Sequence, residues 1–232
     1  MHCNQMTLLT RQENPAWRLV GRLVGDEKHT PSAHSTLDVL WVLYDRVLRV
    51  SPDIVDEPDR DRFLLSKGHG PAAYYAVLAA KGFIPSEWLD DLGGFNSPLG
   101  HHPDNTLIPG VEISSGSLGH GLGLAVGTAL GLRAQGYSDA RTFVLLGDAE
   151  LDEGSNHEAI AYAAAARVPL IAIVIDNQSS TYGWPGGIAA RFIGWSAAVV
   201  DGRDHDAIEH ALQRRDRDRP HLVVAEVARK GS

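Results

Sequence analysis

Apolar residues in the first half of the chain recur at helical spacing between loops rich in glycine and proline. Residues 37–48 carry a periodic apolar stripe that ends before a Ser-Pro pair, which predicts a helix. Residues 71–81 are predicted as a second helix, because proline opens the segment and glycine follows it. Residues 90–109 are interrupted by glycine and proline and are expected to form an irregular loop. Residues 116–134, rich in small residues, are expected to form a helix packed closely against other backbone.

The second half of the chain alternates short apolar runs with helical stretches. Residues 142–146 and 170–175 are continuously apolar, and residues 157–166 between them are predicted to be helical. Strands that are apolar on both faces and alternate with helices are typical of a parallel sheet covered on both sides. The predicted fold class is therefore α/β, a parallel sheet sandwiched by helices. The remaining predicted elements are strands over residues 197–200 and 221–227 and a helix over residues 206–213.

Length and composition narrow the class of protein. The chain has 232 residues and no linker or repeat that divides it, so we expect a single domain over 1–232 with a flexible terminus at 1–13. With 44% apolar and 22% charged residues, the composition excludes disordered, collagen-like and coiled-coil chains. A net charge of −8 argues against a nucleic-acid partner.

Cysteine content and hydropathy indicate the compartment. The one cysteine, Cys3, excludes a disulfide framework and cysteine-ligated zinc or iron–sulfur sites within the chain. The longest apolar run, residues 168–175, is too short to cross a bilayer, so no membrane partner is expected. The polar N-terminus shows no signal peptide. A cytoplasmic protein is predicted, and its 24 glycines and 11 histidines are the compositional features that need an explanation.

Each of the two clearest strands is followed by a side chain with an acceptor oxygen, Asp148 after the first and Asn177 after the second. If the strands are neighbours, the two oxygens converge at the carboxyl edge of the sheet, where open α/β sheets bind ligands. Such oxygens suit Mg²⁺ or Ca²⁺, and the turn that begins at Gly147 leaves backbone amides free for phosphate. The spacing thus predicts a metal-bridged diphosphate. It supports equally an aspartate that caps a helix and an asparagine in a turn.

Several histidines occur in loops that contain glycine. His69 lies within residues 66–70, His102 within residues 100–103, and His29 precedes a predicted helix. A single loop histidine is commonly a surface residue, whereas several in such loops favour a site that moves protons near neutral pH. A zinc hydrolase is disfavoured, because the sequence lacks paired histidines at the helical spacing of zinc ligands.

Six short motifs, in order along the chain, resemble the N-terminal, cofactor-binding half of transketolases. The resemblance covers nearly the whole chain and includes a match to the family's thiamine-diphosphate motif GDGE…EG…EA at residues 147–159, with Asn177 at its closing position. The other matching segments are DRF-x-x-SKGH at residues 61–70, Gly-His-Pro at 100–104, PGVE…TGSLGQG at 109–121, Gly-Trp at 194–195 and Asp-Gly at 201–202.

The resemblance implies the thiamine-diphosphate-binding fold of the family (its PP domain) and a set of cofactor contacts. Asp148, the Asn177 side chain and the Ser179 carbonyl are implied to hold the divalent ion on the diphosphate. The other implied contacts lie around the diphosphate, the aminopyrimidine and the partner side of the cofactor. These residues are His69, Gly116, Leu118, Gly147, Ala149 and Glu153.

The resemblance also implies the chemistry. His29, His69 and His102 are implied to line the reaction centre, where they stabilise a developing alkoxide and move protons during carbon–carbon cleavage. The implied reaction transfers a two-carbon ketol unit from a ketose, expected to be a phosphate, to an aldehyde. The sequence departs from the family at Ala149, where the motif has glycine, and at Ile175, where it has aspartate. A methyl group at residue 149 is tolerable at negative φ and clashes at positive φ.

The family's second domain, which binds the pyrimidine and carries the activating glutamate, does not fit within 232 residues. We therefore expect the N-terminal subunit of a split transketolase, paired with a C-terminal subunit in an α2β2 assembly. His34 and His120 stand where the family has an apolar residue and a glutamine. These changes motivate an alternative, transfer to a carrier-protein or lipoyl arm in specialised biosynthesis. Further hypotheses are a 2-oxo acid dehydrogenase component and a non-catalytic, degenerate subunit.

Overall fold

The fold is built on one parallel sheet of five strands in the order β1-β2-β3-β5-β4. The computed structural model describes all residues except 1–13, 24–29, 70, 215, 217 and 229–232, so the expected flexible terminus lies outside the described residues. The predicted α/β class is confirmed. The main elements are α1 (Pro15–Val20), α2 (Thr30–Val42) with a π-helical turn (Leu43–Val47), β1 (Arg62–Leu65), α3 (Pro71–Ala80), α4 (Gly121–Ala134), β2 (Thr142–Gly147), α5 (Gly154–Ala165), β3 (Leu170–Asp176), β4 (Ser196–Asp201), α6 (His205–Gln213) and β5 (His221–Glu226). Short 3₁₀ helices span Pro52–Ile54, Ser86–Asp91, Ala149–Asp152 and Ile188–Arg191.

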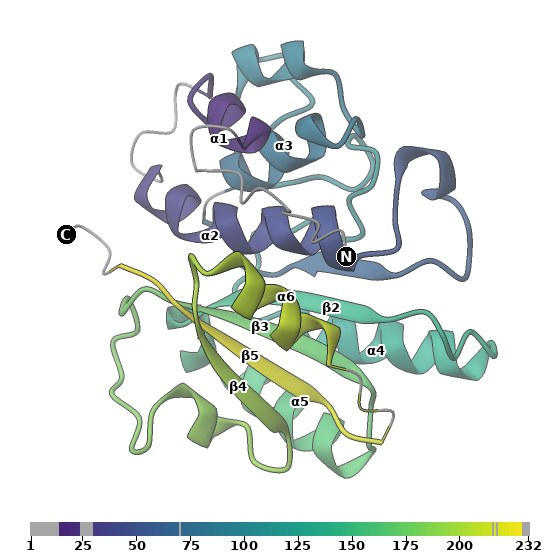
Figure 1. The fold of residues 1–232 in the computed structure, drawn as a ribbon, viewed down its shortest axis with the longest axis vertical. Coiled ribbons are helices and arrows are strands. Elements are labelled where there is room, and N and C mark those ends of the chain that lie inside the picture. The colour runs from purple at the N-terminus through teal and green to yellow at the C-terminus, as the bar shows by residue number, and fades with distance from the viewer. Residues whose placement is uncertain (1–13, 24–29, 70, 215, 217, 229–232) are drawn as a thin grey trace, which may run out of the picture.

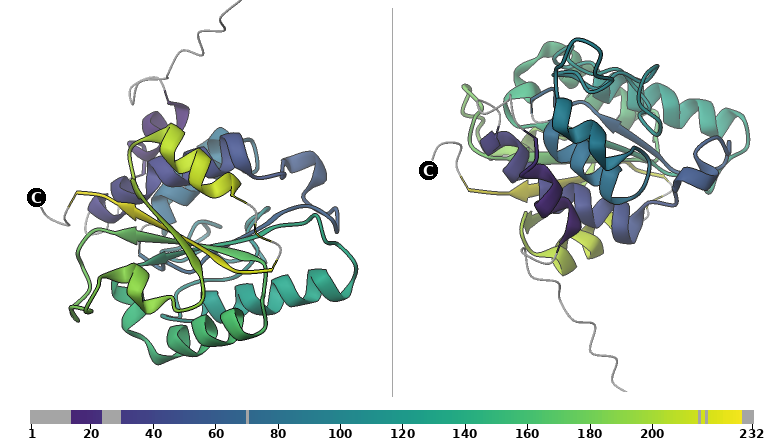
Figure 2. Two further views of the ribbon diagram at one scale, coloured as in Figure 1. Left: turned by 60° about the horizontal axis from the view of Figure 1, so that its bottom comes forward. Right: turned by 90° about the horizontal axis from the view of Figure 1, so that it is seen from above.

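Helices cover both faces of the sheet. Helices α1, α2, α3 and α6 lie over one face, and α4 and α5 lie under the other (Figures 1 and 2). Strand β3 shows why its sequence is continuously apolar: Ile171, Ile173 and Ile175 join the larger core cluster on one side, whereas Ala172 and Val174 join the second cluster on the other. Because both sides of the strand are buried, no polar alternation survives in the sequence.

Two sequence-based predictions are wrong at particular boundaries. The first half was expected to contain helices and loops, yet residues 62–65 form β1, which pairs with β2 at the sheet edge. Four residues that begin with an arginine are too few to show a strand pattern. Helix α4 begins at Gly121 rather than at residue 116, because Gly116 and Gly119 have φ values of +120° and +81°, which a right-handed helix does not contain.

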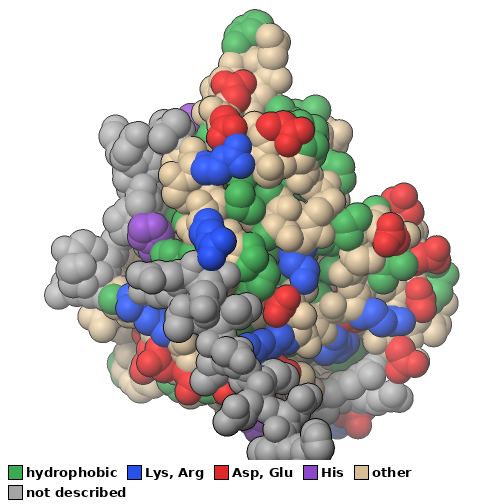
Figure 3. All heavy atoms as spheres, turned by 45° about the horizontal axis from the view of Figure 1, so that its top comes forward, with side chains coloured by type: hydrophobic (Ala, Val, Ile, Leu, Met, Phe, Trp, Pro, Cys, Tyr) green, Lys and Arg blue, Asp and Glu red, His purple; other side chains and the backbone are tan. Residues whose placement is uncertain are grey.

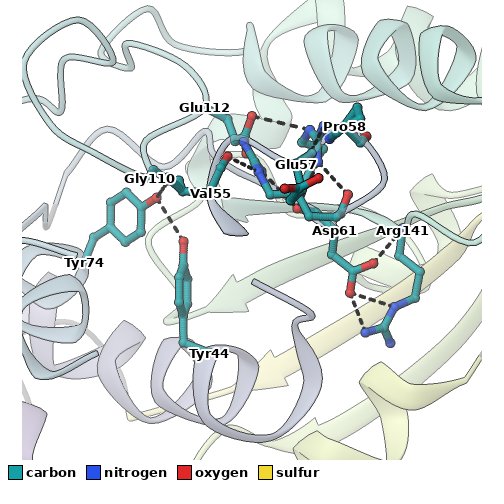
Figure 4. A network of polar contacts seen from close by, with 11 residues as sticks. Tyr44, Val55, Glu57, Pro58, Asp61, Tyr74, Gly110, Glu112 and Arg141 are labelled. Carbon is teal, nitrogen blue, oxygen red and sulfur yellow. Dashed lines mark hydrogen bonds and ion pairs between the residues drawn. The ribbon is translucent and has the colours of Figure 1, made fainter. Parts of the chain in front are cut away.

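A polar network fixes the amino end of β1 and the loop that follows α3 (Figure 4). Asp61 is 1% exposed and pairs with the Arg141 guanidinium at 2.6 Å. The Asp61 carboxylate also accepts the backbone N–H of Arg49 at 2.9 Å and that of Arg141 at 2.8 Å. Nearby, the hydroxyl oxygens of Tyr44 and Tyr74 lie 3.1 Å apart, and Tyr74 donates to the Gly110 carbonyl at 3.3 Å. The Asp61 contacts lie at the amino end of β1, because Asp61 directly precedes the strand.

The surface mixes charges of both signs. On the face drawn in Figure 3, Lys and Arg side chains are interspersed with Asp and Glu. Within the part of the chain that the structure describes, no helix is long and apolar enough to cross a membrane.

Candidate cofactor-binding site

Strands β2 and β3 are direct neighbours, which brings their carboxyl ends to one point. Gly147 pairs with Ile175, and the Asp148 N–H donates to the Ile175 carbonyl at 3.1 Å. Asp148 and Asn177 are 2% and 3% exposed. The two strands are therefore adjacent, as the predicted convergence of Asp148 and Asn177 requires. Ile175 is fully buried in the core, so its position has no polar function in this chain.

The Asp148 carboxylate closes the loop that follows β3. It accepts the backbone N–H groups of Ala149 at 2.9 Å, Ser179 at 2.6 Å and Ser180 at 3.1 Å, and the Ser179 hydroxyl at 2.5 Å. Asp148 is also the N-cap of the 3₁₀ helix Ala149–Asp152. The capping role that the sequence left as an alternative is thus present. These four donors use the roughly four lone-pair sites of a carboxylate.

Asn177 differs from Asp148 because its amide oxygen is unused. Oδ1 of Asn177 is buried and has no hydrogen-bond partner among the described residues. A buried acceptor without a partner costs free energy unless a ligand supplies the contact. No cluster of three or more His, Cys, Asp or Glu side chains able to hold a metal was found in the described part of the chain. One carboxylate and one amide oxygen are a small protein donor set, of the kind that leaves positions for phosphate oxygens.

Ala149 creates no backbone strain. Among the described non-glycine residues, only Arg167 and Gln178 have positive φ, so Ala149 lies in the region that tolerates a β-carbon. Its methyl group is half-buried at the start of the 3₁₀ helix. Of the two cases considered from the sequence, the structure therefore shows the tolerable one, in which φ of residue 149 is negative.

Two of the predicted histidines lie together. His69 and His102 are both exposed, with ring centroids 6.5 Å apart in an edge-to-face arrangement. Nδ1 of His102 lies 3.0 Å from the Gly68 carbonyl oxygen. That contact assigns the proton to Nδ1 in the neutral ring and leaves Nε2 as the free acceptor. His29 lies outside the described residues.

The loop before α4 approaches the histidine loop closely. A β-carbon on Gly116 would lie 2.9 Å from Cγ of His102, and one on Gly119 would lie 2.8 Å from Cβ of Glu153. Leu118, between the two glycines, is 51% exposed. The glycines therefore permit a backbone contact that other residues would block. Glu153 is exposed at the start of α5, and its side chain makes no capping hydrogen bond.

Glu150, which is not among the site residues predicted from the sequence, is buried within the site. This residue is 2% exposed, and its carboxylate accepts the Ser66 hydroxyl and the N–H groups of Gly119 and Gly147. Burial raises the pKa of Glu150, and its hydrogen bonds to Ser66, Gly119 and Gly147 oppose that shift. A signal existed in the sequence: a glutamate in the turn after an apolar strand, where it was treated only as part of the phosphate-binding segment.

The two unusual histidines lie in different places. The ring of His34, on α2, packs against Trp17 with centroids 5.3 Å apart. His120 adjoins the loop before α4, where its Nδ1 is 2.7 Å from the Ser117 hydroxyl. His120 is therefore next to the predicted cofactor contacts Leu118 and Gly116 in the sequence.

The family model "Transketolase, thiamine diphosphate binding domain" matches residues 25–229. This match spans most of the chain, and the chain belongs to the transketolase family. The expected family, fold and class of enzyme, a transketolase-type transferase subunit with a thiamine-diphosphate-binding domain, are confirmed.

Curated relatives named as single subunits of transketolases resemble the chain over most of its length. It is 36% identical to an apulose-4-phosphate transketolase subunit of Actinobacillus succinogenes, over 85% of this chain and 75% of that protein. It is 34% identical to "6-deoxy-6-sulfo-D-fructose transketolase subunit SqwG" of a Clostridium species, over 84% and 75% of the two chains. A further relative carries a different name: "Ferredoxin fas2" of Rhodococcoides fascians is 58% identical over 92% of this chain and 71% of that protein.

Solved transketolases share the fold. A mutant enzyme from Pichia stipitis superposes with a TM-score of 0.78 at 26% identity, over 92% of this chain. The enzyme from Campylobacter jejuni superposes with a TM-score of 0.74 at 26% identity, over 90% of this chain. The chain spans 36% and 37% of those proteins, so it corresponds to about a third of a full-length transketolase.

Proposed function

We propose that this chain is the thiamine-diphosphate-binding subunit of a two-subunit transketolase, which transfers a two-carbon ketol unit from a ketose to an aldehyde. The observation that carries the proposal is the sheet edge itself. There Asp148 and the unpartnered Asn177 oxygen follow β2 and β3, and the His69–His102 pair lies beside the adjoining loop. Membership of the transketolase family supports the reaction class.

The donor atoms at this edge suit a divalent ion that carries a diphosphate. Asp148, the Asn177 amide oxygen and the Ser179 carbonyl would hold Mg²⁺ or Ca²⁺, both of which prefer oxygen ligands. The Asp148 lone pairs are already used by four donors, so the ion must displace one of them. The Ser179 hydroxyl is the donor that can rotate away, whereas the three others are backbone N–H groups held by the loop.

The remaining contacts would hold the organic part of the cofactor. Thiamine diphosphate, when bound, supplies the nucleophilic carbon and the electron sink that carbon–carbon cleavage requires. His69 would contact the diphosphate, and Gly116 and Leu118 would support the aminopyrimidine. Gly147 and Ala149 would adjoin the diphosphate, but their N–H groups, which the sequence predicts to be free for phosphate, donate to the Glu150 and Asp148 carboxylates. Glu153 would face the partner side.

The histidines would move protons at the substrate. With its proton on Nδ1, His102 offers Nε2 to a substrate hydroxyl as a base. His69, whose ring lies 6.5 Å away, would donate to the oxygen on which charge develops. We assign His29 to the same centre on the family resemblance alone.

The names of the relatives suggest the chemical class of the donor sugar. One relative is named for apulose 4-phosphate and another for 6-deoxy-6-sulfo-D-fructose, so each is named for a sugar with an anionic group at one end. We infer that the donor here is a ketose of this class. Both relatives are named as transketolase subunits, which supports a separate C-terminal partner that would supply the pyrimidine-binding domain and the activating glutamate in an α2β2 complex.

The test mixes the chain with its C-terminal partner, MgCl₂, thiamine diphosphate, xylulose 5-phosphate and either an aldose phosphate or a lipoyl-bearing protein as acceptor. We expect turnover with the aldose only when both subunits are present. Full ketol transfer by the pure chain would contradict the two-subunit proposal. Consumption of the donor only with the lipoyl acceptor would favour the carrier alternative, and absence of cofactor binding by calorimetry would favour the degenerate subunit.

A further inference from the structure

The Glu150 carboxylate joins three segments that are distant in sequence. Its Oε1 accepts the Ser66 hydroxyl and, at 3.1 Å, the Gly119 N–H, while its Oε2 accepts the Gly147 N–H at 3.3 Å. Ser66 follows β1, Gly119 precedes α4, and Gly147 ends β2. Each donor therefore comes from a different segment of the candidate site, two from loops and one from the carboxyl end of β2.

Hydrogen bonds offset the free-energy cost of burying the Glu150 carboxylate. Carboxylates are almost never fully buried without partners, because desolvation disfavours the charge. Here the acceptor side is filled by two backbone N–H groups and one hydroxyl, at the N-terminus of α4, where the helix dipole favours a negative charge. The Ser66 oxygen accepts the Gly121 N–H at 3.0 Å and thereby caps the same helix. His120, the N-cap residue, makes no side-chain capping hydrogen bond.

The backbone of Glu150 is itself anchored. Asn156, on α5, donates its amide N–H to the Glu150 carbonyl at 2.6 Å. A β-carbon on Gly121 would collide with the Ser66 side chain, so the loops after β1 and before α4 are in direct contact. A displacement of one loop must therefore displace its neighbour.

Each of the three segments leads directly to a proposed cofactor contact. His69 lies three residues after Ser66, Leu118 immediately precedes Gly119, and Asp148 immediately follows Gly147. We propose that Glu150 is a positioning residue: its carboxylate holds the three segments in the cofactor-binding arrangement before the cofactor arrives. This inference rests on the proposed function for the identity of the ligand, and on the hydrogen bonds alone for the pre-arrangement of the loops.

The decisive variant is Glu150→Gln, which keeps the shape and replaces one oxygen by a donor. One of the N–H or O–H donors must then face another donor. In the full chain without cofactor, we expect amide hydrogen exchange at Gly119 and Gly147 to become at least about tenfold faster, because exchange reports local opening. In the complex with the partner subunit, we expect calorimetry with thiamine diphosphate and MgCl₂ to give a Kd raised about 10- to 100-fold, the range for groups that support ligands indirectly.

Asp61→Asn is the matched control. Asp61 is also buried and, like Glu150, accepts two backbone N–H groups, to which it adds an ion pair with Arg141; it precedes β1, whereas Ser66 follows β1 (Figure 4). We expect this variant to lower the midpoint of thermal unfolding and to leave exchange at Gly119 and Gly147, and the cofactor Kd, within about twofold of the wild type. A general loss of stability would instead change both variants alike.

Ser66→Ala provides a second route if Glu150→Gln does not fold. It removes one donor and leaves the carboxylate in place, so we expect smaller changes in exchange and Kd in the same direction. Wild-type exchange and Kd in both site variants, or the same changes in Asp61→Asn, would overturn the positioning role. A wild-type complex that binds no thiamine diphosphate would overturn the proposed function alone, because the exchange experiment contains no cofactor.

Discussion

Replacement of Gly116 by alanine tests the closest backbone contact of the candidate site. Gly116 has φ of +120°, and an added β-carbon would lie 2.9 Å from Cγ of the His102 ring. The substitution therefore combines an unfavourable backbone conformation with a steric overlap. The first costs about 1–3 kcal/mol and the second about 1–3 kcal/mol, so the free energy of unfolding should fall by about 2–6 kcal/mol.

Urea unfolding of the chain measures this change, and thermal unfolding should show a midpoint lower by about 4–24 °C for a chain of this size. Gly123→Ala is the matched control, because a β-carbon there meets nothing within 4 Å and Gly123 lies inside α4. Alanine at that position should stabilise by about 0.5–1 kcal/mol. If Gly116→Ala changes stability by less than about 0.5 kcal/mol, the close approach of the two loops is wrong.

Three further predictions concern ligands and pH. Asp148→Asn should abolish magnesium-dependent binding of thiamine diphosphate in calorimetry, whereas Asp176→Asn, next to the site on β3, should leave it intact; equal effects would refute the assignment of the ligand. Ser179→Ala should keep or raise the affinity for Mg²⁺, because it removes a competing donor and retains the carbonyl; a loss of affinity would show that the hydroxyl itself is required. Burial, then the positive charge of Arg214, lowers the pKa of His221 from its ordinary value of 6.5. The neutral ring stabilises the fold above pH 6.5, and this contribution is lost as pH falls through the lowered pKa. Urea unfolding between pH 5 and 7.5 should therefore show a weaker pH dependence in His221→Gln, and equal slopes would contradict the shift.

The strands were predictable from sequence where burial was complete. Strands β2 and β3 contain long apolar runs because both of their faces pack against helices. These runs identified the two strands and therefore also the polar residues that follow them. Strand β1 escaped detection, since its four residues begin with Arg62 and provide no pattern of their own. Its place in the sheet comes from pairing with β2, which is information that no local window contains.

Within the site, too, residues next to strand ends were predictable from the sequence, whereas residues defined by long-range contacts were not. Asp148 and Asn177 were found because each stands directly after a strand, and strand ends are readable in the sequence. The sequence places Glu150 in the turn after β2, but its hydrogen-bond partners could not be predicted, because Ser66 and Gly119 lie 84 and 31 positions away along the chain. Tertiary contacts of this length leave no periodic signal. The φ angle of Ala149 was likewise not predictable, because it depends on the conformation of the turn and not on the sequence of that turn alone.

The site has a buried end and an exposed end, and the two should respond differently to the partner subunit. Asp148, Asn177 and Glu150 are at most 3% exposed, whereas Leu118 is 51% exposed and His69 lies at the surface. The proposed chemistry requires a site from which water is excluded, and the exposed rim of this chain does not provide one by itself. We therefore expect Leu118→Ala to leave binding of MgCl₂ and inorganic diphosphate to the isolated chain unchanged and to lower turnover only in the assembled complex. Asn177→Ala should weaken diphosphate binding in both forms. Weaker diphosphate binding by the isolated Leu118→Ala chain would refute this division between an end held by this chain and a rim completed by its partner.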